Sequence, residues 1–217
     1  MSTLVCFALK EEAAPFRRRA AQRPGVFTLI TGMGRERAGL AVRDFLGMGA
    51  AVAPSRVFTC GFAGGLHPDG RSGEVIFEIA GPDAALNAAL RAKLLAAGAK
   101  PGTFFCADRI AITAAEKRRL RAETGADAVE MESAAIHAVC RERGLPCATV
   151  RVISDAADED LPLDFNALFK PDQSLRWGRL LLTLARSPGK IGALPALQKQ
   201  TRRAAQRLAE VLTQALA

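Results

Sequence analysis

The sequence predicts an α/β fold in which helices cover both faces of a largely parallel or mixed sheet. Short apolar runs alternate with segments of helical spacing through most of the chain. Several of these runs end in turns that are rich in glycine or in acidic residues. The 217 residues, 49% of them hydrophobic and 24% charged, are typical of one globular unit with a sizeable core. We therefore expect a single domain over 1–217, of which 161–217 is a helical C-terminal part.

The predicted strands are short apolar runs that contain β-branched and aromatic residues. We expect them at 3–9, 27–34, 57–66, 73–80 and 103–112, at the start of 126–144, and over 145–158 with a loop at the end. In such sheets the ligand site lies at the carboxyl ends of the strands. Four of these ends carry polar or glycine-rich turns, with the sequences LKEE, TGMG, FAGG and ISDAAD.

Helices are predicted where apolar residues recur every three or four positions. In the segment 126–144, for example, Ile136, Val139 and Cys140 share one helical face. The expected helices are 10–20, 35–49, 83–98, 116–125 (a helix or turn), the second part of 126–144, 174–186 and 195–216. Residues 161–171 are expected to form a loop, and the final helix is amphipathic and basic at its start.

Charge and cysteine content limit the class of protein. The net charge of +8 suits an ordinary basic protein better than a nucleic-acid binder, because Tyr is absent and Trp occurs once. No signal peptide or membrane-spanning run is evident, and the five cysteines form no CxxC pair. We expect a cytoplasmic protein whose thiols are buried and reduced.

Two acidic motifs are the strongest chemical signals. In AVEMESAA, Glu130 and Glu132 lie where an apolar strand turns into a helix, and a carboxylate there can accept hydrogen bonds from a ribose diol. In RVISDAAD, a strand delivers Ser154 and Asp155 to its carboxyl end, where a buried aspartate can act as a general acid. The alternative for the first motif is an acid that only caps the helix, with Glu130 solvated. The alternative for the second motif is an ordinary aspartate in a turn.

The remaining motifs are weaker. The glycine turns TGMGRERAG and CGFAGGL allow a ligand to approach the backbone, but neither matches a dinucleotide fingerprint or a phosphate loop. His67 and His137 form no metal pattern with nearby acids and are interpreted as structural residues. We therefore do not expect a nicotinamide cofactor or a nucleoside triphosphate.

Taken in order, FALKEEAAPF, TGMGRERA, CGFAGGLHPDGRSGEV, AVEMESAA and RVISDAAD resemble the purine nucleoside phosphorylase superfamily, over about residues 3–160. The similarity is greatest to its methylthioadenosine and S-adenosylhomocysteine nucleosidase branch. The resemblance implies a three-layer αβα sandwich around a mixed sheet, a dimer or larger homo-oligomer, and no cofactor or metal. It also implies cleavage of the N-glycosidic bond of a purine nucleoside, with adenine as the expected base.

The resemblance also implies roles for individual residues. Asp155 is similar to the acid that protonates the purine at N7, Glu132 to the carboxylate that binds the ribose hydroxyls, and Glu12 to the carboxylate that activates water. The residues implied to bind substrate are Met33, Ala63, Gly64, Gly65, Glu130, Met131 and Ser154. Met131 would pack under the ribose and Met33 would lie near the 5′ substituent.

Three positions depart from the family pattern. Phe62 replaces a serine usual in the nucleosidases, and Ile110 lies where those enzymes often place an aromatic residue that stacks on adenine. Thr59 stands where the phosphorylases place a phosphate-binding arginine, which favours water as the nucleophile. A phosphate-binding site is still compatible with the sequence, because another arginine, such as Arg17, Arg35 or Arg37, would be able to supply it.

Three other readings remain open. The first is an enzyme that acts on a lipid-linked nucleoside such as adenosylhopane, with the basic, leucine-rich segment 174–207 against an anionic membrane surface. The second is a non-catalytic nucleoside-binding protein on the same scaffold. The third is a nucleic-acid binder that uses the positive charge.

Overall fold

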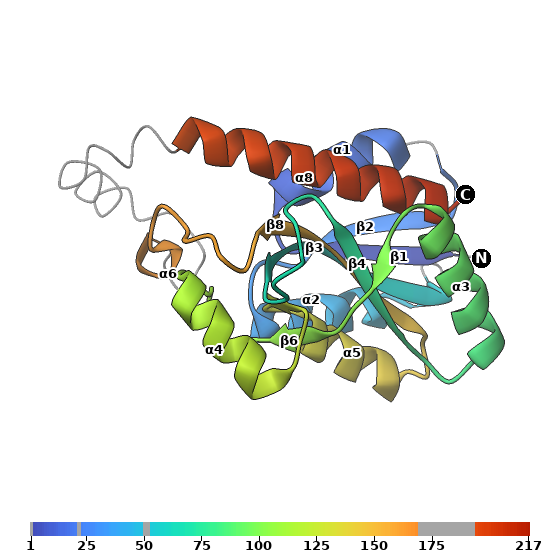
Figure 1. Ribbon diagram of the computed structural model, residues 1–217. Helices are drawn as coiled ribbons and strands as arrows, with labels where there is room; N and C mark the ends of the chain where they lie inside the picture. The colour runs from blue at the N-terminus through green and yellow to red at the C-terminus, as the bar shows by residue number, and fades with distance from the viewer. Residues whose placement is uncertain (1, 21–22, 50–52, 169–193) are drawn as a thin grey trace.

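The computed structural model describes residues 2–20, 23–49, 53–168 and 194–217. Within these ranges the chain folds around one eight-stranded sheet with the strand order β2-β1-β3-β8-β4-β5, to which β7 and β6 are joined through β3 (Figure 1). The strands are β1 (Thr3–Phe7), β2 (Val26–Ile30), β3 (Arg56–Gly65), β4 (Val75–Ala80), β5 (Lys100–Pro101), β6 (Phe104–Cys106), β7 (Ala128–Glu130) and β8 (Cys147–Asp155).

The sheet is mixed, as the sequence predicts. Strand β1 runs parallel to both β2 and β3, and β3 runs parallel to β8. Strand β4 is antiparallel to β8, and β7 is antiparallel to β3. The carboxyl ends of β1, β3 and β8 consequently lie at the same edge of the sheet, which is where a ligand site is expected.

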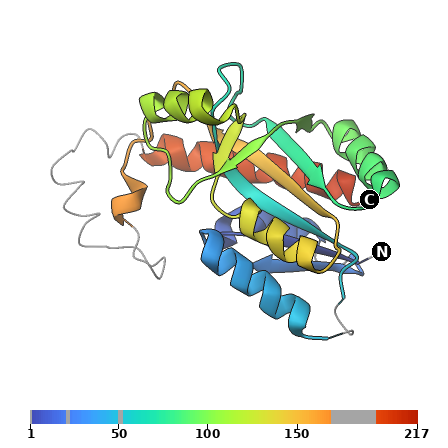
Figure 2. The ribbon, with the colours of Figure 1, turned by 90° about the horizontal axis from the view of Figure 1, so that it is seen from below.

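Helices cover both faces and complete the predicted three layers. On one face lie α1 (Lys10–Ala20), α3 (Ala84–Ala96) and α8 (Leu194–Ala215), which share a core cluster with the sheet. On the other face, α2 (Arg35–Gly47) and α5 (Ser133–Glu142) pack against each other and on the strands. Figure 1 shows α1 and α8 above the sheet, and Figure 2 shows α2 and α5 side by side on the face below it.

The local predictions differ from the structure in a few places. The strand expected over 103–112 ends at Cys106, because residues 107–113 form a loop before α4 (Ala114–Thr124). The loop expected over 161–171 contains the short helix α6 (Phe165–Leu168). The helix expected over 174–186 lies outside the described residues. All five cysteines are buried, in agreement with the prediction.

One part of the fold closes over the edge where the strands end. Figure 1 shows α4, α6 and the first turns of α8 together at this end of the molecule.

Among the residues that the structure describes, no helix combines the length and the apolar character needed to cross a membrane.

Candidate active site

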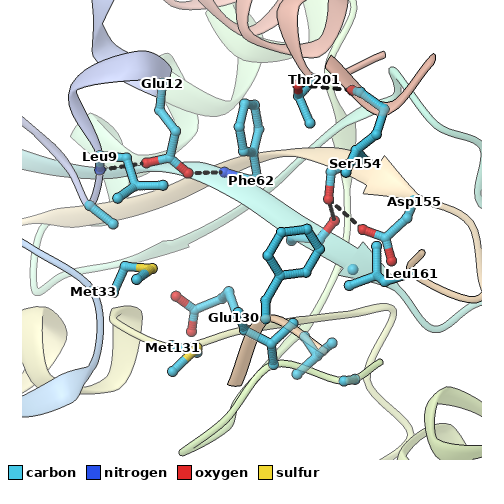
Figure 3. A pocket seen from close by; sticks show the side chains of 18 of the residues that line it. Leu9, Glu12, Met33, Phe62, Glu130, Met131, Ser154, Asp155, Leu161 and Thr201 are labelled. Atoms are coloured by element: carbon cyan, nitrogen blue, oxygen red, sulfur yellow. Dashed lines mark hydrogen bonds between the residues drawn. The ribbon is translucent and has the colours of Figure 1, made fainter. Parts of the chain in front are cut away.

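A cavity of about 720 Å³ opens at the carboxyl ends of β1, β3 and β8. Its lining includes five polar side chains that can take part in acid–base chemistry or hydrogen bonding to a ligand, which are Glu12, Glu130, Glu132, Ser154 and Asp155. Figure 3 shows Glu12 on one side of this pocket and Ser154 with Asp155 on the other. The volume lies within the range of small-molecule sites in proteins.

Glu12 occupies the first turn of α1 and is buried. Its two carboxylate oxygens accept hydrogen bonds from the main-chain amides of Leu9, at 3.0 Å, and Phe62, at 2.9 Å (Figure 3). Burial raises the pKa of Glu12 to about 7, with the negative charge of Glu132 adding to the rise and Arg151 opposing it. Such a carboxyl group can gain or lose a proton near neutral pH.

Glu130 and Glu132 flank Met131 at the turn from β7 into α5, and both carboxylates contact the guanidinium of Arg151. Nη2 of Arg151 donates to Glu130 Oε2 at 2.5 Å and to Glu132 Oε2 at 3.1 Å. Glu132 Oε1 also accepts a hydrogen bond from the Gly34 amide at 2.9 Å. Both carboxylates are thus fixed in place by charged or main-chain donors.

The two glutamates differ in their electrostatics. Burial raises the pKa of Glu132, and the nearby Glu130 charge adds to this although Arg151 opposes it. Burial also disfavours the charge on Glu130, but Arg151 and hydrogen bonds from Ser133 hold the pKa of Glu130 below its ordinary value. Glu130 accepts from the amides of Glu132 and Ser133, so it caps α5 from inside the protein. The alternative of a solvated Glu130 is therefore wrong.

Asp155, at the end of β8, has a partner at each carboxylate oxygen. The Ser154 hydroxyl donates to Oδ1 at 2.5 Å, and the ammonium of Lys117 forms an ion pair with Oδ2. Lys117 extends from α4, and its side chain is fully buried. Gly64 lies against this pair, since a Cβ atom added there would be 3.4 Å from Asp155 Oδ2 and 3.9 Å from Lys117 Cε.

Much of the remaining wall of the cavity is apolar. Leu9 and Phe62 come from the sheet edge, whereas Ile110 comes from the loop before α4. Ile110 is held in place by Asn166 of α6, which both accepts from its amide and donates to its carbonyl at 2.9 Å. The other large apolar lining residues are Met33, Val129, Met131, Leu161, Phe165, Pro195 and Leu197.

Nine of the ten predicted site residues line this one cavity, and Gly65 is the exception. Gly65 pairs with Ala128 across the β3–β7 ladder, and a Cβ atom there would be 3.1 Å from the Asp155 carbonyl oxygen. Gly65 therefore contacts the main chain behind Asp155 rather than the cavity.

The sequence predictions left out Arg109, which lines the cavity, and two buried charged residues that contact the predicted carboxylates, Arg151 and Lys117. Arg151 occurs within the apolar strand VRVIS, and a charge there indicates a buried ion pair. Lys117 carries no comparable signal, because it stands among other charged residues in AEKRRLRAE, which is typical of a solvated helix.

The positions considered for phosphate binding lie elsewhere. Thr59 is buried in β3, where its hydroxyl accepts a hydrogen bond from Arg151 at 3.1 Å. Arg17 is exposed on α1, and Arg35 pairs with Asp108 beside a second, smaller cavity. Neither these two arginines nor Arg37 is among the described residues that line the main cavity.

Comparisons with known proteins agree with this architecture. The model of the phosphorylase superfamily matches residues 74–186. An aminodeoxyfutalosine nucleosidase of Helicobacter pylori (strain ATCC 700392 / 26695) is 38% identical over 71 residues, which cover 33% of this chain and 31% of that protein. The match thus spans only about a third of this curated relative.

Solved structures match over nearly the whole length. The 5′-methylthioadenosine/S-adenosylhomocysteine nucleosidase from Helicobacter pylori, with butyl-thio-DADMe-Immucillin-A, has a TM-score of 0.71 and 18% identity, covering 100% of this chain and 98% of that chain. The enzyme of the same name from Neisseria meningitidis, in complex with methylthio-immucillin-A, has a TM-score of 0.72 and 18% identity, covering 99% and 98%. At this level of identity the likeness shows the fold.

Proposed function

The chain belongs to the phosphorylase superfamily, and from this premise we propose that it hydrolyses the N-glycosidic bond of a purine nucleoside, with adenine as the expected base. One observation carries the proposal: Glu12, Glu132 and Asp155 are buried around one cavity, each with different partners. Hydrolysis of this bond needs three such groups, one to protonate the base, one to bind the ribose and one to activate water.

Asp155 is proposed to protonate the purine at N7, which makes the base a better leaving group. The hydrogen bond from Ser154 fixes the orientation of its carboxyl group. Its place at the carboxyl end of β8 fits the usual position of functional groups in an open α/β sheet.

Glu132 is proposed to accept hydrogen bonds from the ribose 2′ and 3′ hydroxyls. Each of its oxygens already accepts one hydrogen bond, from Gly34 or Arg151, and each retains a lone pair for a hydroxyl. Met131 and Met33 line the cavity nearby and offer apolar surface for the sugar and its 5′ substituent. The negative charge of Glu132 would also stabilise the oxocarbenium-like transition state.

Glu12 is proposed to orient and deprotonate the attacking water. Its pKa of about 7 suits a general base near neutral pH. Gly61 keeps the space between Glu12 and Arg151 narrow but open, since a Cβ atom there would be 2.8 Å from Glu12 Oε1 and 2.7 Å from Arg151 Nη1.

The charges around the cavity favour water over phosphate as the nucleophile. Three carboxylates line the described part of the cavity beside Glu12, and they would repel a phosphate dianion. Among the described residues, the arginines at or near this site are already engaged, Arg151 with Glu130 and Glu132 and Arg109 with Glu116.

Base release from a panel of nucleosides tests this function. The panel contains methylthioadenosine, S-adenosylhomocysteine, aminodeoxyfutalosine, adenosine, inosine and adenosylhopane, each incubated with and without phosphate. We expect free base and free sugar without phosphate. Release that requires phosphate, with a sugar 1-phosphate as product, would identify a phosphorylase instead. Tight binding without release would identify a nucleoside-binding protein.

A second candidate substrate is a nucleoside with a large apolar 5′ substituent, such as adenosylhopane. The apolar wall formed by Leu9, Phe62, Ile110 and Phe165 favours it. Basic side chains are exposed near the start of α8, at Lys199, Arg202 and Arg203, and they suit an anionic membrane surface. Preferential cleavage of adenosylhopane, with co-sedimentation of the protein with anionic vesicles at low salt, would support this candidate. Cleavage of methylthioadenosine alone, with no sedimentation, would exclude it.

A homo-oligomer, expected to be a dimer, stays a prediction. Light scattering on the eluting protein tests it, since a dimer has twice the 23.0 kDa mass of the chain. Elution at the monomer mass across micromolar concentrations would contradict it.

A further inference from the structure

Lys117 is a buried cation in direct contact with the proposed general acid. Its side chain has no solvent exposure, and its ammonium donates to the carbonyl oxygens of Ala156, at 2.8 Å, and Glu159, at 2.7 Å. The ammonium also forms an ion pair with Asp155 Oδ2, a buried oxygen that accepts no hydrogen bond from the described residues. The buried charge of Lys117 thus has one carboxylate partner and two carbonyl acceptors, as a buried charge requires.

This contact creates a conflict with the role of Asp155. An adjacent ammonium favours the ionised form of a carboxyl group, whereas a general acid has to hold a proton. Ser154, whose hydroxyl contacts Asp155 Oδ1 and the Ala63 carbonyl oxygen, does not supply that proton, because a neutral alcohol is too weak an acid. The conflict disappears if the proton needed by the base is stored on the lysine.

We propose that Lys117 supplies, through Asp155, the proton that the leaving base acquires. The inference rests on the proposed hydrolysis. As the bond from the sugar carbon to the base nitrogen breaks, its electron pair passes to the base. Asp155 gives a proton to N7 of the base and takes one from Lys117, which becomes a neutral amine. Water adds to the sugar cation and loses a proton to Glu12, and both side chains then re-equilibrate with bulk water.

The other groups around this pair are neutral or have partners of their own. Gly64 offers no side chain on the β3 side, and Ser154 and Gln200 are neutral. The charged side chains on the elements packed around the pair have other partners, namely Glu130 with Arg151, Arg109 with Glu116, Glu159 with the Ala156 amide, and Asp160 with the Ala114 amide. Among the described residues, Asp155 is the carboxylate that pairs with Lys117, which makes it the acceptor for a proton that leaves the ammonium.

The pH dependence of kcat/KM separates this role from a structural one. Lys117→Gln removes the charge but keeps an NH₂ group that can donate to both carbonyl oxygens. Without the ammonium, Asp155 is an isolated buried acid that is active only while it carries its own proton. We expect kcat/KM within about fivefold of the native protein at pH 5.5, and a fall of about tenfold per pH unit above the point where that proton is lost. The matched control Lys93→Gln, at an exposed position of α3, should follow the native profile.

Lys117→Arg provides the second test. Arginine keeps a cation beside Asp155 but does not release its proton. We expect the kcat of this variant to be about 100-fold or more below that of the native protein at every pH from 5.5 to 9, while the protein stays folded. The assays use whichever of methylthioadenosine, aminodeoxyfutalosine or adenosylhopane the native protein cleaves fastest.

The outcomes distinguish this inference from the proposed function. A Lys117→Gln variant with the native pH profile, or with the same loss at every pH, would overturn the role of Lys117. Near-native kcat in Lys117→Arg would do the same. Both results leave hydrolysis itself standing, which fails if the native protein releases no base or releases it only with phosphate. Full activity in Asp155→Asn would instead contradict the assignment of Asp155 as the acid.

Discussion

Replacing Arg151 by methionine should destabilise the protein strongly. The guanidinium is fully buried in β8, and it donates to Thr59, Cys60, Glu130 and Glu132. A methionine side chain fills most of the volume but leaves two buried carboxylates without their cation. Breaking a buried ion pair by removing one partner costs about 3–5 kcal/mol. We expect a loss of that size in the free energy of unfolding at pH 7.

The size of this loss should depend on pH in a defined direction. The pKa of Glu130 lies below its ordinary value in the folded protein, with Arg151 as the main stabilising cause. The contribution of ionised Glu130 to stability is therefore present above the pKa that Glu130 has in the unfolded chain. It disappears as the pH falls through the pKa that Glu130 has in the folded protein. The Arg151→Met variant lacks this contribution, so the difference between variant and native protein should narrow as the pH falls below about 4.5.

Urea unfolding at pH 7 and pH 4, followed by circular dichroism, measures both effects. Arg202→Met, at an exposed position of α8, is the matched control and should change stability by less than about 0.5 kcal/mol. A loss below about 1 kcal/mol for Arg151→Met, or an equal loss at both pH values, would refute the argument that this arginine neutralises the buried carboxylates.

Two further predictions concern the water side of the cavity. The kcat/KM of the native protein should fall as the pH drops through about 7, because Glu12 must be ionised to act as a base and its pKa is about 7. A kcat/KM that stays constant down to pH 5 would exclude this role. Gly61→Ala should lower kcat by about 100-fold, because the added Cβ atom would be 2.8 Å from Glu12 Oε1 and would displace the carboxylate. Gly47→Ala, in open space at the end of α2, is the control. Near-native activity in Gly61→Ala would contradict the role of the Glu12 carboxylate as the base.

The sheet and most of its helices were predictable, because each strand is a short apolar run with a marked end. The prediction failed at 103–112, where the apolar pattern continues past the end of the strand. Ile110 belongs to a loop whose conformation is held by Asn166, far away in sequence, and its side chain lines the cavity instead of the core. Nothing local in the sequence distinguishes these two uses of an apolar residue.

The site was predictable to the extent that its groups occupy strand ends and helix starts. Asp155 and Glu132 follow apolar strands, so their positions indicate the edge of the sheet. Arg151 could have been identified as a buried partner, because a charge in the middle of an apolar strand requires one. Lys117 could not, because its burial depends on how α4 packs against the loop after β8.

Base release by the native protein and by Asp155→Asn, in the absence of phosphate, tests the proposed hydrolysis most directly. Asp158→Asn, three residues further on and exposed, is the matched control. We predict free base from at least one nucleoside of the panel, a loss of kcat of about 10²–10⁴-fold in Asp155→Asn, and native kcat in Asp158→Asn. Equal rates for the native protein and Asp155→Asn would contradict the assignment of Asp155 as the acid on which the mechanism depends.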